Sequence, residues 1–223
     1  MVDQEQRRRW ERFATTNPEF YIWTDVAHGD DFAASGRRDA ERIFALCEPH
    51  LARRQVVLEI GCGMGRLLMP MAERFGRAVG VDISATMLAH LRQRCAAAGV
   101  ENVTGALPED AWDGEAVLDL AYSHIVFQHI GNWDDIADYF RRVARALAPG
   151  GVFYAQFDTR SPTLPYRVKT ALPDFLLPTT MRRGVRRIRR TVAEIERLAK
   201  SCGLRTVSQS GEGSTDTAFV FVR

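Results

Sequence analysis

A glycine turn and a downstream carboxylate are the residues whose types and spacing best suit ligand chemistry. The run Val57-Leu58-Glu59-Ile60-Gly61-Cys62-Gly63-Met64-Gly65 predicts a short buried strand that ends in a glycine turn and enters a helix. Glycines at three alternate positions let the backbone approach a ligand closely, since a Cβ atom would clash there. Asp82 ends a second apolar run, 17 residues after Gly65. Together, the turn and the acid predict a nucleoside site, with the acid on the ribose hydroxyls.

The spacing Glu59-x-Gly61-x-Gly63-x-Gly65 resembles the first motif, E/D-x-G-x-G-x-G, of the class I S-adenosylmethionine-dependent methyltransferases. Dinucleotide enzymes favour G-x-G-x-x-G instead. Three later segments resemble the family in the same order: its fourth strand (117–124), a histidine-containing segment common in small-molecule members (125–130), and the L-x-P-G-G turn before its fifth strand (147–151). The resemblance covers roughly residues 55 to 157 and implies methyl transfer from S-adenosylmethionine.

The resemblance also implies which residues hold the methyl donor. Asp82 would bind the ribose, and Gly61, Gly63 and the neighbouring backbone would contact the amino-acid end of the donor. The expected donor site is completed by Glu59, Cys62, Ile83, Met87, Ala106, Leu107 and Ser123. The family often carries an acid after the third strand for the adenine amino group, and this chain lacks it beside Gly105. Backbone groups of Ala106 and Leu107, or Glu109 or Asp110 reaching back, are the alternatives.

Polar residues that follow the predicted strand 117–123 are candidates for the methyl-transfer chemistry. Ligands of open α/β sheets lie beyond the carboxyl ends of the strands, so Ser123 and His124 should face the transferring methyl group. Histidine suits a general base because its ordinary pKa is about 6.5. We expect His124 or His129 to accept a proton from a substrate hydroxyl that Gln128 or Ser123 orients, although His129 could instead be structural. No metal is expected, since His124 stands where a catechol-type enzyme needs an oxygen-rich cluster.

The elements that must position these residues alternate between strand and helix. This alternation predicts an α/β, doubly wound, Rossmann-like fold with a seven-stranded sheet, mostly parallel with an antiparallel last strand. Strands are expected at 56–60, 78–82, 102–104, 117–123, 152–157, 204–208 and 217–222, and helices at 37–51, 65–75, 84–98, 133–147 and 191–202.

The whole of 1–223 is interpreted as a single methyltransferase domain. Its parts are a helical N-terminal cap (1–54), a donor-binding core (55–157), an insertion that covers the substrate (158–190), and a closing helix and hairpin (191–223). The cap is rich in aromatic residues. Tyr21, Trp23 or Phe32 is expected to line the donor or substrate cavity; the alternative is that these side chains only attach the cap to the core.

Six arginines between positions 182 and 190 are the main indication of the acceptor. Arg182 and Arg183 are expected to bind a phosphate or carboxylate of an acidic acceptor. Contact with nucleic acid or an anionic membrane, helped by Phe175-Leu176-Leu177, is one alternative. The other alternative is that these arginines only form a solvated surface ahead of a helix.

Bulk properties narrow the function further. A net charge of +2 does not imply a nucleic-acid partner, and the N/D-P-P-Y/F signature of nucleic-acid amino-methyltransferases is absent. The chain has no apolar run long enough to cross a membrane and no apolar signal-peptide core, and its four scattered cysteines suit a reduced, cytoplasmic protein. From the family resemblance and the candidate histidine base we expect O-methylation of a small molecule such as a sugar or natural product, with N-methylation as an alternative. The alternatives are an RNA or protein methyltransferase, or a non-catalytic donor-binding partner subunit.

Overall fold

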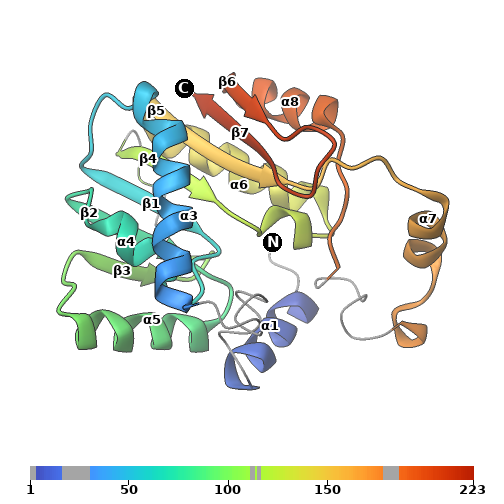
Figure 1. The fold of residues 1–223 in the computed structure, drawn as a ribbon, viewed down its shortest axis with the longest axis horizontal. Helices are drawn as coiled ribbons and strands as arrows, with labels where there is room; N and C mark the ends of the chain where they lie inside the picture. The colour runs from blue at the N-terminus through green and yellow to red at the C-terminus, as the bar shows by residue number, and fades with distance from the viewer. Residues whose placement is uncertain (1–3, 17–30, 111–113, 115–116, 178–185) are drawn as a thin grey trace.

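The computed structural model describes residues 4–16, 31–110, 114, 117–177 and 186–223. A seven-stranded sheet in the order β3-β2-β1-β4-β5-β7-β6 forms its centre (Figure 1). The strands are β1 (Val56–Ile60), β2 (Arg77–Val81), β3 (Val103–Ala106), β4 (Leu118–Ser123), β5 (Leu147–Phe157), β6 (Arg205–Ser210) and β7 (Thr217–Val222). Strands β1 to β5 pair in parallel, and β7 runs antiparallel to both β5 and β6. The predicted fold class is confirmed.

Helices cover both faces of this sheet. They are α1 (Gln4–Thr16), α3 (Phe32–Cys47), α4 (Leu68–Ala72), α5 (Ala85–Ala98), α6 (Trp133–Ala146), α7 (Leu164–Ala171) and α8 (Val192–Ser201), with short 3₁₀ turns η2 (Glu48–His50), η3 (Phe127–His129) and η4 (Asp174–Leu176). One apolar core joins the sheet to α6 and α8, and a second joins it to α3, α4 and α5. A parallel sheet buried on both faces requires these two cores. Within the described residues, no helix is long and apolar enough to span a bilayer.

Aromatic packing holds the first core together. Phe140 on α6 meets Phe153 on β5 edge-on with ring centroids 5.0 Å apart, and Phe219 and Phe221 on β7 stack nearly parallel at 5.8 Å. All four rings are fully buried. Such pairs add about 0.5–1.5 kcal/mol each beyond the burial of their area. This packing holds α6 and β7 against β5, the strand that pairs with β4 next to the site.

Several element boundaries differ from the predictions for local reasons. The helix expected over 65–75 is shorter in the structure, where it is α4. A proline is tolerated only in the first turn of a helix, so α4 cannot begin more than a few residues before Pro70. Strand β5 begins at Leu147 rather than Val152, since Leu147 already pairs with Leu118 across an irregular register. Helix α3 begins earlier than expected because the carboxylate of Asp31 caps its N-terminus. The predicted capping box of Thr191 and Glu194 at the start of α8 is confirmed.

Gly36 sets how closely α3 approaches the glycine turn. A Cβ atom at this position would lie 2.2 Å from the backbone oxygen of Arg66. We expect Gly36→Ala to lower the free energy of unfolding by about 3 kcal/mol, at the upper end of the usual range for overpacking. Urea titration of both proteins measures the change. Gly131→Ala, where the nearest atom would be 3.8 Å away, is the control, and equal stability of the two variants would contradict the close approach.

Candidate active site

A cavity of about 140 Å³ opens at the carboxyl ends of β1, β2 and β4. Ligand sites of doubly wound sheets are expected at this edge. The cavity is lined by residues of the glycine turn, of the loops after β2 and β4, and of helices α1, α5 and α6: Gln6, Trp10, Glu59, Ile60, Gly61, Cys62, Gly63, Arg66, Leu67, Val81, Asp82, Ile83, Met87, His124, Ile125, Val126, His129, Ile130, Asp135 and Tyr139.

The glycine turn and Asp82 are joined directly. The backbone amide of Gly63 donates to Oδ2 of Asp82 at 2.8 Å, and the amide of Ser84 donates to Oδ1 at 2.9 Å. Gly61 and Gly63 both have positive φ, which favours glycine. Burial raises the pKa of Asp82 to about 6, against the effect of the two amides. Near neutral pH the carboxylate is therefore mostly ionised and holds the turn in place before any ligand arrives.

Glu59, the acid that opens the motif, lies at the floor of the cavity. The hydroxyl of Tyr122 on β4 donates to its Oε2 at 3.0 Å. Burial raises the pKa of Glu59 to about 8, while this hydrogen bond and the charge of Arg66 act in the opposite direction. Arg66 is itself buried and also lines the cavity. The floor thus places a carboxyl group and a guanidinium within one apolar pocket.

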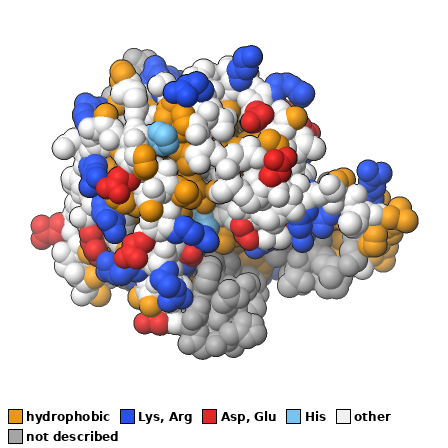
Figure 2. Space-filling view, turned by 45° about the horizontal axis from the view of Figure 1, so that its top comes forward, with side chains coloured by type: hydrophobic (Ala, Val, Ile, Leu, Met, Phe, Trp, Pro, Cys, Tyr) orange, Lys and Arg blue, Asp and Glu red, His pale blue; other side chains and the backbone are white. Residues whose placement is uncertain are grey.

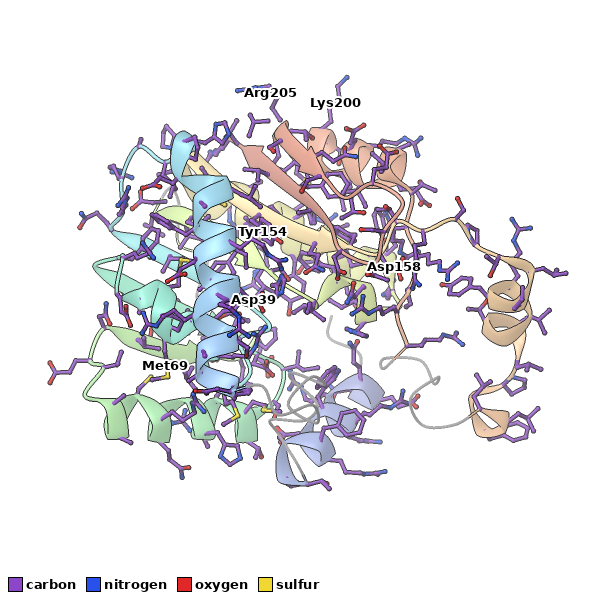
Figure 3. The ribbon with its side chains drawn as sticks, in the orientation of Figure 1. Asp39, Met69, Tyr154, Asp158, Lys200 and Arg205 are labelled. Atoms are coloured by element: carbon purple, nitrogen blue, oxygen red, sulfur yellow. The ribbon has the colours of Figure 1, made fainter. Side chains whose placement is uncertain are left out.

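His124 follows β4 and lies in the cavity wall with its imidazole almost fully buried. Its Nε2 is 3.9 Å from Oδ2 of Asp39, and Asp39 also accepts a 2.8 Å hydrogen bond from Nη1 of Arg66. Figure 3 labels Asp39 on α3. Burial lowers the pKa of His124 to about 4, although the Asp39 carboxylate acts to raise it. The ring is therefore neutral at physiological pH and can accept a proton.

The backbone that directs His124 into the cavity is strained. Ile125 has φ of +58°, which is unfavourable for a β-branched residue. Its amide donates to Oε1 of the buried Gln156 at 3.2 Å, and Nε2 of Gln156 donates to Asp216 at 2.6 Å. Such strain persists only where the surroundings enforce it, and it is concentrated at functional sites.

Helix α1 closes one side of the cavity beside His129. The side-chain amide of Gln6 donates to the backbone oxygen of His129 at 3.3 Å, and the rings of Trp10 and His129 meet edge-on at 6.3 Å. The carboxylate of Glu11 accepts a hydrogen bond of 2.6 Å from the amide of Ala85, at the start of α5. The cap therefore reaches the site through α1 as well as through α3.

The structure brings most of the predicted donor residues together, with some exceptions. Glu59, Gly61, Cys62, Gly63, Asp82, Ile83 and Met87 line the cavity, as do His124 and His129. Four candidates do not line it: Ala106, Leu107, Ser123 and Gln128. The hydroxyl of Ser123 donates to the backbone of Ile60 across the sheet, and η3 turns Gln128 fully inward. Tyr21, Trp23, Arg182 and Arg183 lie outside the described residues.

The alternatives for adenine recognition have other partners within the structure. The carboxylate of Glu109 pairs with Arg7 of α1 through two bonds of 2.9 and 2.7 Å, and Asp110 accepts from the amide of Leu107 at 2.7 Å. Phe32, the third aromatic candidate of the cap, is buried at the start of α3 beneath the guanidinium of Arg94. These side chains therefore hold the walls of the site in place.

Several contributors to the site are absent from the sequence predictions, among them Arg66, Asp39, Gln6 and Trp10. The sequence does indicate a position near the ligand for Arg66, because this residue directly follows the glycine turn. No local pattern indicates the other three. Packing of the cap brings Gln6 and Trp10 to the cavity, and it brings Asp39 to Arg66 and His124, which line it. Among the described residues, no group of three or more His, Cys, Asp or Glu side chains is placed to hold a metal ion.

Comparison with known proteins agrees with this geometry. Residues 57–151 match the family model described as a methyltransferase domain. The malonyl-[acyl-carrier protein] O-methyltransferase of Salmonella typhimurium is 37% identical over 101 residues, covering 43% of this chain and 36% of that protein. The trans-aconitate 2-methyltransferase of Delftia acidovorans is 30% identical over 169 residues, covering 71% and 56%. The chain thus spans about a third to just over half the length of these curated relatives.

The solved structures that resemble this chain give the same fold. Magnesium protoporphyrin IX methyltransferase from Synechocystis PCC 6803 superposes with a TM-score of 0.68 at 16% identity, covering 98% of this chain and 99% of that one. A methyltransferase from Clostridium acetobutylicum superposes with a TM-score of 0.66 at 17% identity, covering 90% and 96%. With the strand order and the joined glycine turn and acid, the family match identifies residues 57–151 as a methyltransferase domain of the class I S-adenosylmethionine-dependent type.

Proposed function

We propose that this protein binds S-adenosylmethionine and transfers its methyl group to an oxygen of a small-molecule acceptor. The observation that carries the proposal is that Asp82, hydrogen-bonded to the glycine turn, and a neutral buried His124 line the same cavity. The residues fit the cofactor, since Asp82 offers a carboxylate for ribose hydroxyls and positive-φ glycines leave the backbone open. Bound S-adenosylmethionine supplies an activated methyl group.

In this proposal His124 is the general base. Its imidazole accepts the proton of the acceptor hydroxyl, and the Asp39 carboxylate 3.9 Å from Nε2 stabilises the imidazolium that forms. A conjugate acid with a pKa of about 4 makes a weak base. The site therefore suits a hydroxyl more acidic than that of a simple alcohol, such as a phenol. His129, beside α1, helps to enclose the bound ligands.

A carboxylate acceptor is the second candidate. Two curated relatives are named for an O-methyltransferase and for a trans-aconitate methyltransferase, and aconitate is a polycarboxylic acid. Arg66 lines the cavity with a buried guanidinium that is paired on one side with the Asp39 carboxylate. A carboxylate is already ionised at neutral pH and needs no general base, so the two acceptor classes differ in their need for His124.

The first experiment is calorimetric titration of the purified protein with S-adenosylmethionine and, separately, with NAD. We expect micromolar binding of the first and none of the second. A screen of phenols, acidic sugars and polycarboxylates for methyl transfer then follows. A folded protein that binds neither cofactor would overturn the proposal. Donor binding without turnover on any acceptor class would favour a partner subunit or a macromolecular acceptor.

Asp39 is expected to act as a positioning residue through His124. Asp39→Asn keeps the shape but removes the charge, so the pKa of His124 should fall and the imidazolium should lose its stabilisation. We expect kcat to drop about tenfold, equivalent to about 1.4 kcal/mol, with the acid limb of the pH–rate profile moved to lower pH.

The matched control for this change is Glu41→Gln, on the exposed side of the same helix. It should leave both kcat and the pH profile unchanged. A lowered kcat in Asp39→Asn without a shift of the acid limb would show that Asp39 only supports the fold.

A further inference from the structure

Helix α7 and the turn after it form an arm that projects from the body (Figure 1). Six large hydrophobic side chains are exposed among the described residues, and five of them lie on this arm: Leu164, Val168, Leu172, Phe175 and Leu176. Leu164 and Phe175 are 75% and 78% exposed. Concentrated apolar exposure of this kind marks an interaction site rather than ordinary surface variation.

The exposed residues share one side of the helix. Leu164, Val168 and Leu172 follow one another at intervals of four and therefore form a continuous stripe. Tyr166 lies on the opposite side, where its hydroxyl accepts a 3.1 Å hydrogen bond from the amide of Arg189 and its ring lies 4.2 Å from the Arg189 guanidinium carbon. The inward side of α7 is thus occupied by the chain's own return segment, and the apolar stripe faces outward.

The charge of the chain is divided unequally between the insertion that contains the arm and the rest of the chain. The segment 160–190 contains nine of the 30 basic residues and one of the 28 acidic residues, so it carries +8 while the remainder carries −6. Figure 2 shows hydrophobic side chains gathered at the tip of the arm with Lys or Arg side chains beside them. An apolar stripe flanked by positive charge is complementary to an anionic lipid surface.

We propose that the arm of α7 and η4 docks reversibly onto the surface of an anionic phospholipid bilayer. Leu164, Val168, Phe175 and Leu176 enter the interface, and Arg167 lies beside the stripe to meet the headgroups. The acidic body is repelled by the same surface, so the arm points toward the membrane. A nucleic-acid partner would match the charge but would leave the apolar stripe in water.

The segment that joins the arm to the body is held by backbone hydrogen bonds, which docking of the arm does not disturb. The amide of Ile188 donates to the backbone oxygen of Gln128 at 2.6 Å, and the amide of Arg190 donates to that of Asp158 at 2.9 Å. Figure 3 labels Asp158 where the chain leaves β5 toward α7. These bonds anchor both ends of the insertion at the sheet edge that carries the cavity, so the docked protein holds its active site close to the bilayer.

Vesicle flotation tests the proposal, using phosphatidylcholine alone and phosphatidylcholine mixed with phosphatidylglycerol. The wild type should float with the anionic vesicles only, and added salt should release it. Phe175→Ser combined with Leu176→Ser should weaken partitioning about tenfold, and Arg167→Gln should weaken it only at low salt. Val117→Ser, at an exposed apolar residue that precedes β4, is the matched control and should float as the wild type does.

Two further measurements make the result decisive. Cofactor binding and thermal melting should be unchanged in the arm variants, which separates docking from folding. Sedimentation should show the same mass for wild type and for the double variant. Absence of flotation with anionic vesicles overturns the proposal, and loss of a dimer in the double variant, or salt-sensitive RNA binding in place of flotation, would assign the arm to those partners instead.

Discussion

Replacing Asp82 with alanine is expected to weaken S-adenosylmethionine binding between about 10-fold and 100-fold. Hydrogen bonds to a charged group contribute about 1.5–3 kcal/mol, and each 1.4 kcal/mol changes Kd tenfold. The variant loses the proposed bonds to the ribose and also the bond from the Gly63 amide that holds the turn. Calorimetric titration with the cofactor measures the change.

The pH dependence of the wild type provides an independent check on Asp82. Burial raises its pKa to about 6, and only the ionised form accepts two hydroxyl hydrogen bonds. Affinity should therefore be full above this pH and fall as the pH is lowered through it. Glu196→Ala, at an exposed carboxylate on α8, is the control and should bind normally. Equal cofactor affinity of the two variants would contradict the assignment of Asp82 to the cofactor site.

Replacing His124 with glutamine is expected to lower kcat about 10²- to 10³-fold while leaving cofactor affinity within about threefold of the wild type. A positioned general base contributes about 10²–10⁴ to the rate, and glutamine keeps polar atoms but cannot take the proton. At saturating cofactor, the wild-type rate should be flat near neutral pH and fall toward pH 4, where the imidazole becomes protonated. Steady-state kinetics across this range measure both effects.

His129→Gln is the comparison for this result. His129 lines the same cavity, and its ring lies against Trp10. We expect its loss to reduce kcat by less than about tenfold, since enclosure rather than proton transfer is removed. Near-normal turnover in both variants would contradict a histidine base and would support the carboxylate acceptor.

The parts of the site that could be predicted from sequence are those that local pattern specifies. Gly61, Gly63 and Asp82 were predicted because a strand, a turn and the next strand determine their positions within about 25 residues. The position of His124 followed from the rule that strand ends face the ligand. Each of these predictions needed the fold class but no knowledge of side-chain packing.

The parts that could not be predicted depend on packing between distant segments. Asp39 meets His124 across 85 positions only because Gly36 lets α3 lie against the glycine turn. Gln128 was expected to orient the acceptor, yet the 3₁₀ turn η3 rotates it into the interior, one residue away from a histidine that does line the cavity. Hydrophobic periodicity does not specify the direction of a side chain in so short a turn.

The way α1 is attached has a kinetic consequence. The helix lies beside the cavity on two kinds of contact. Phe13 and Ala14 are buried, whereas the Arg7–Glu109 pair and the Glu11–Ala85 hydrogen bond lie at the surface. Exposed ion pairs of this kind contribute about 0–1 kcal/mol. Two buried side chains therefore supply most of the free energy that holds the helix, and they are few enough that it can open locally without unfolding the sheet. We therefore expect the dwell time of the cofactor to be set by the opening rate of α1. Two proteins with the same equilibrium affinity could then differ widely in exchange rate through changes confined to this one helix.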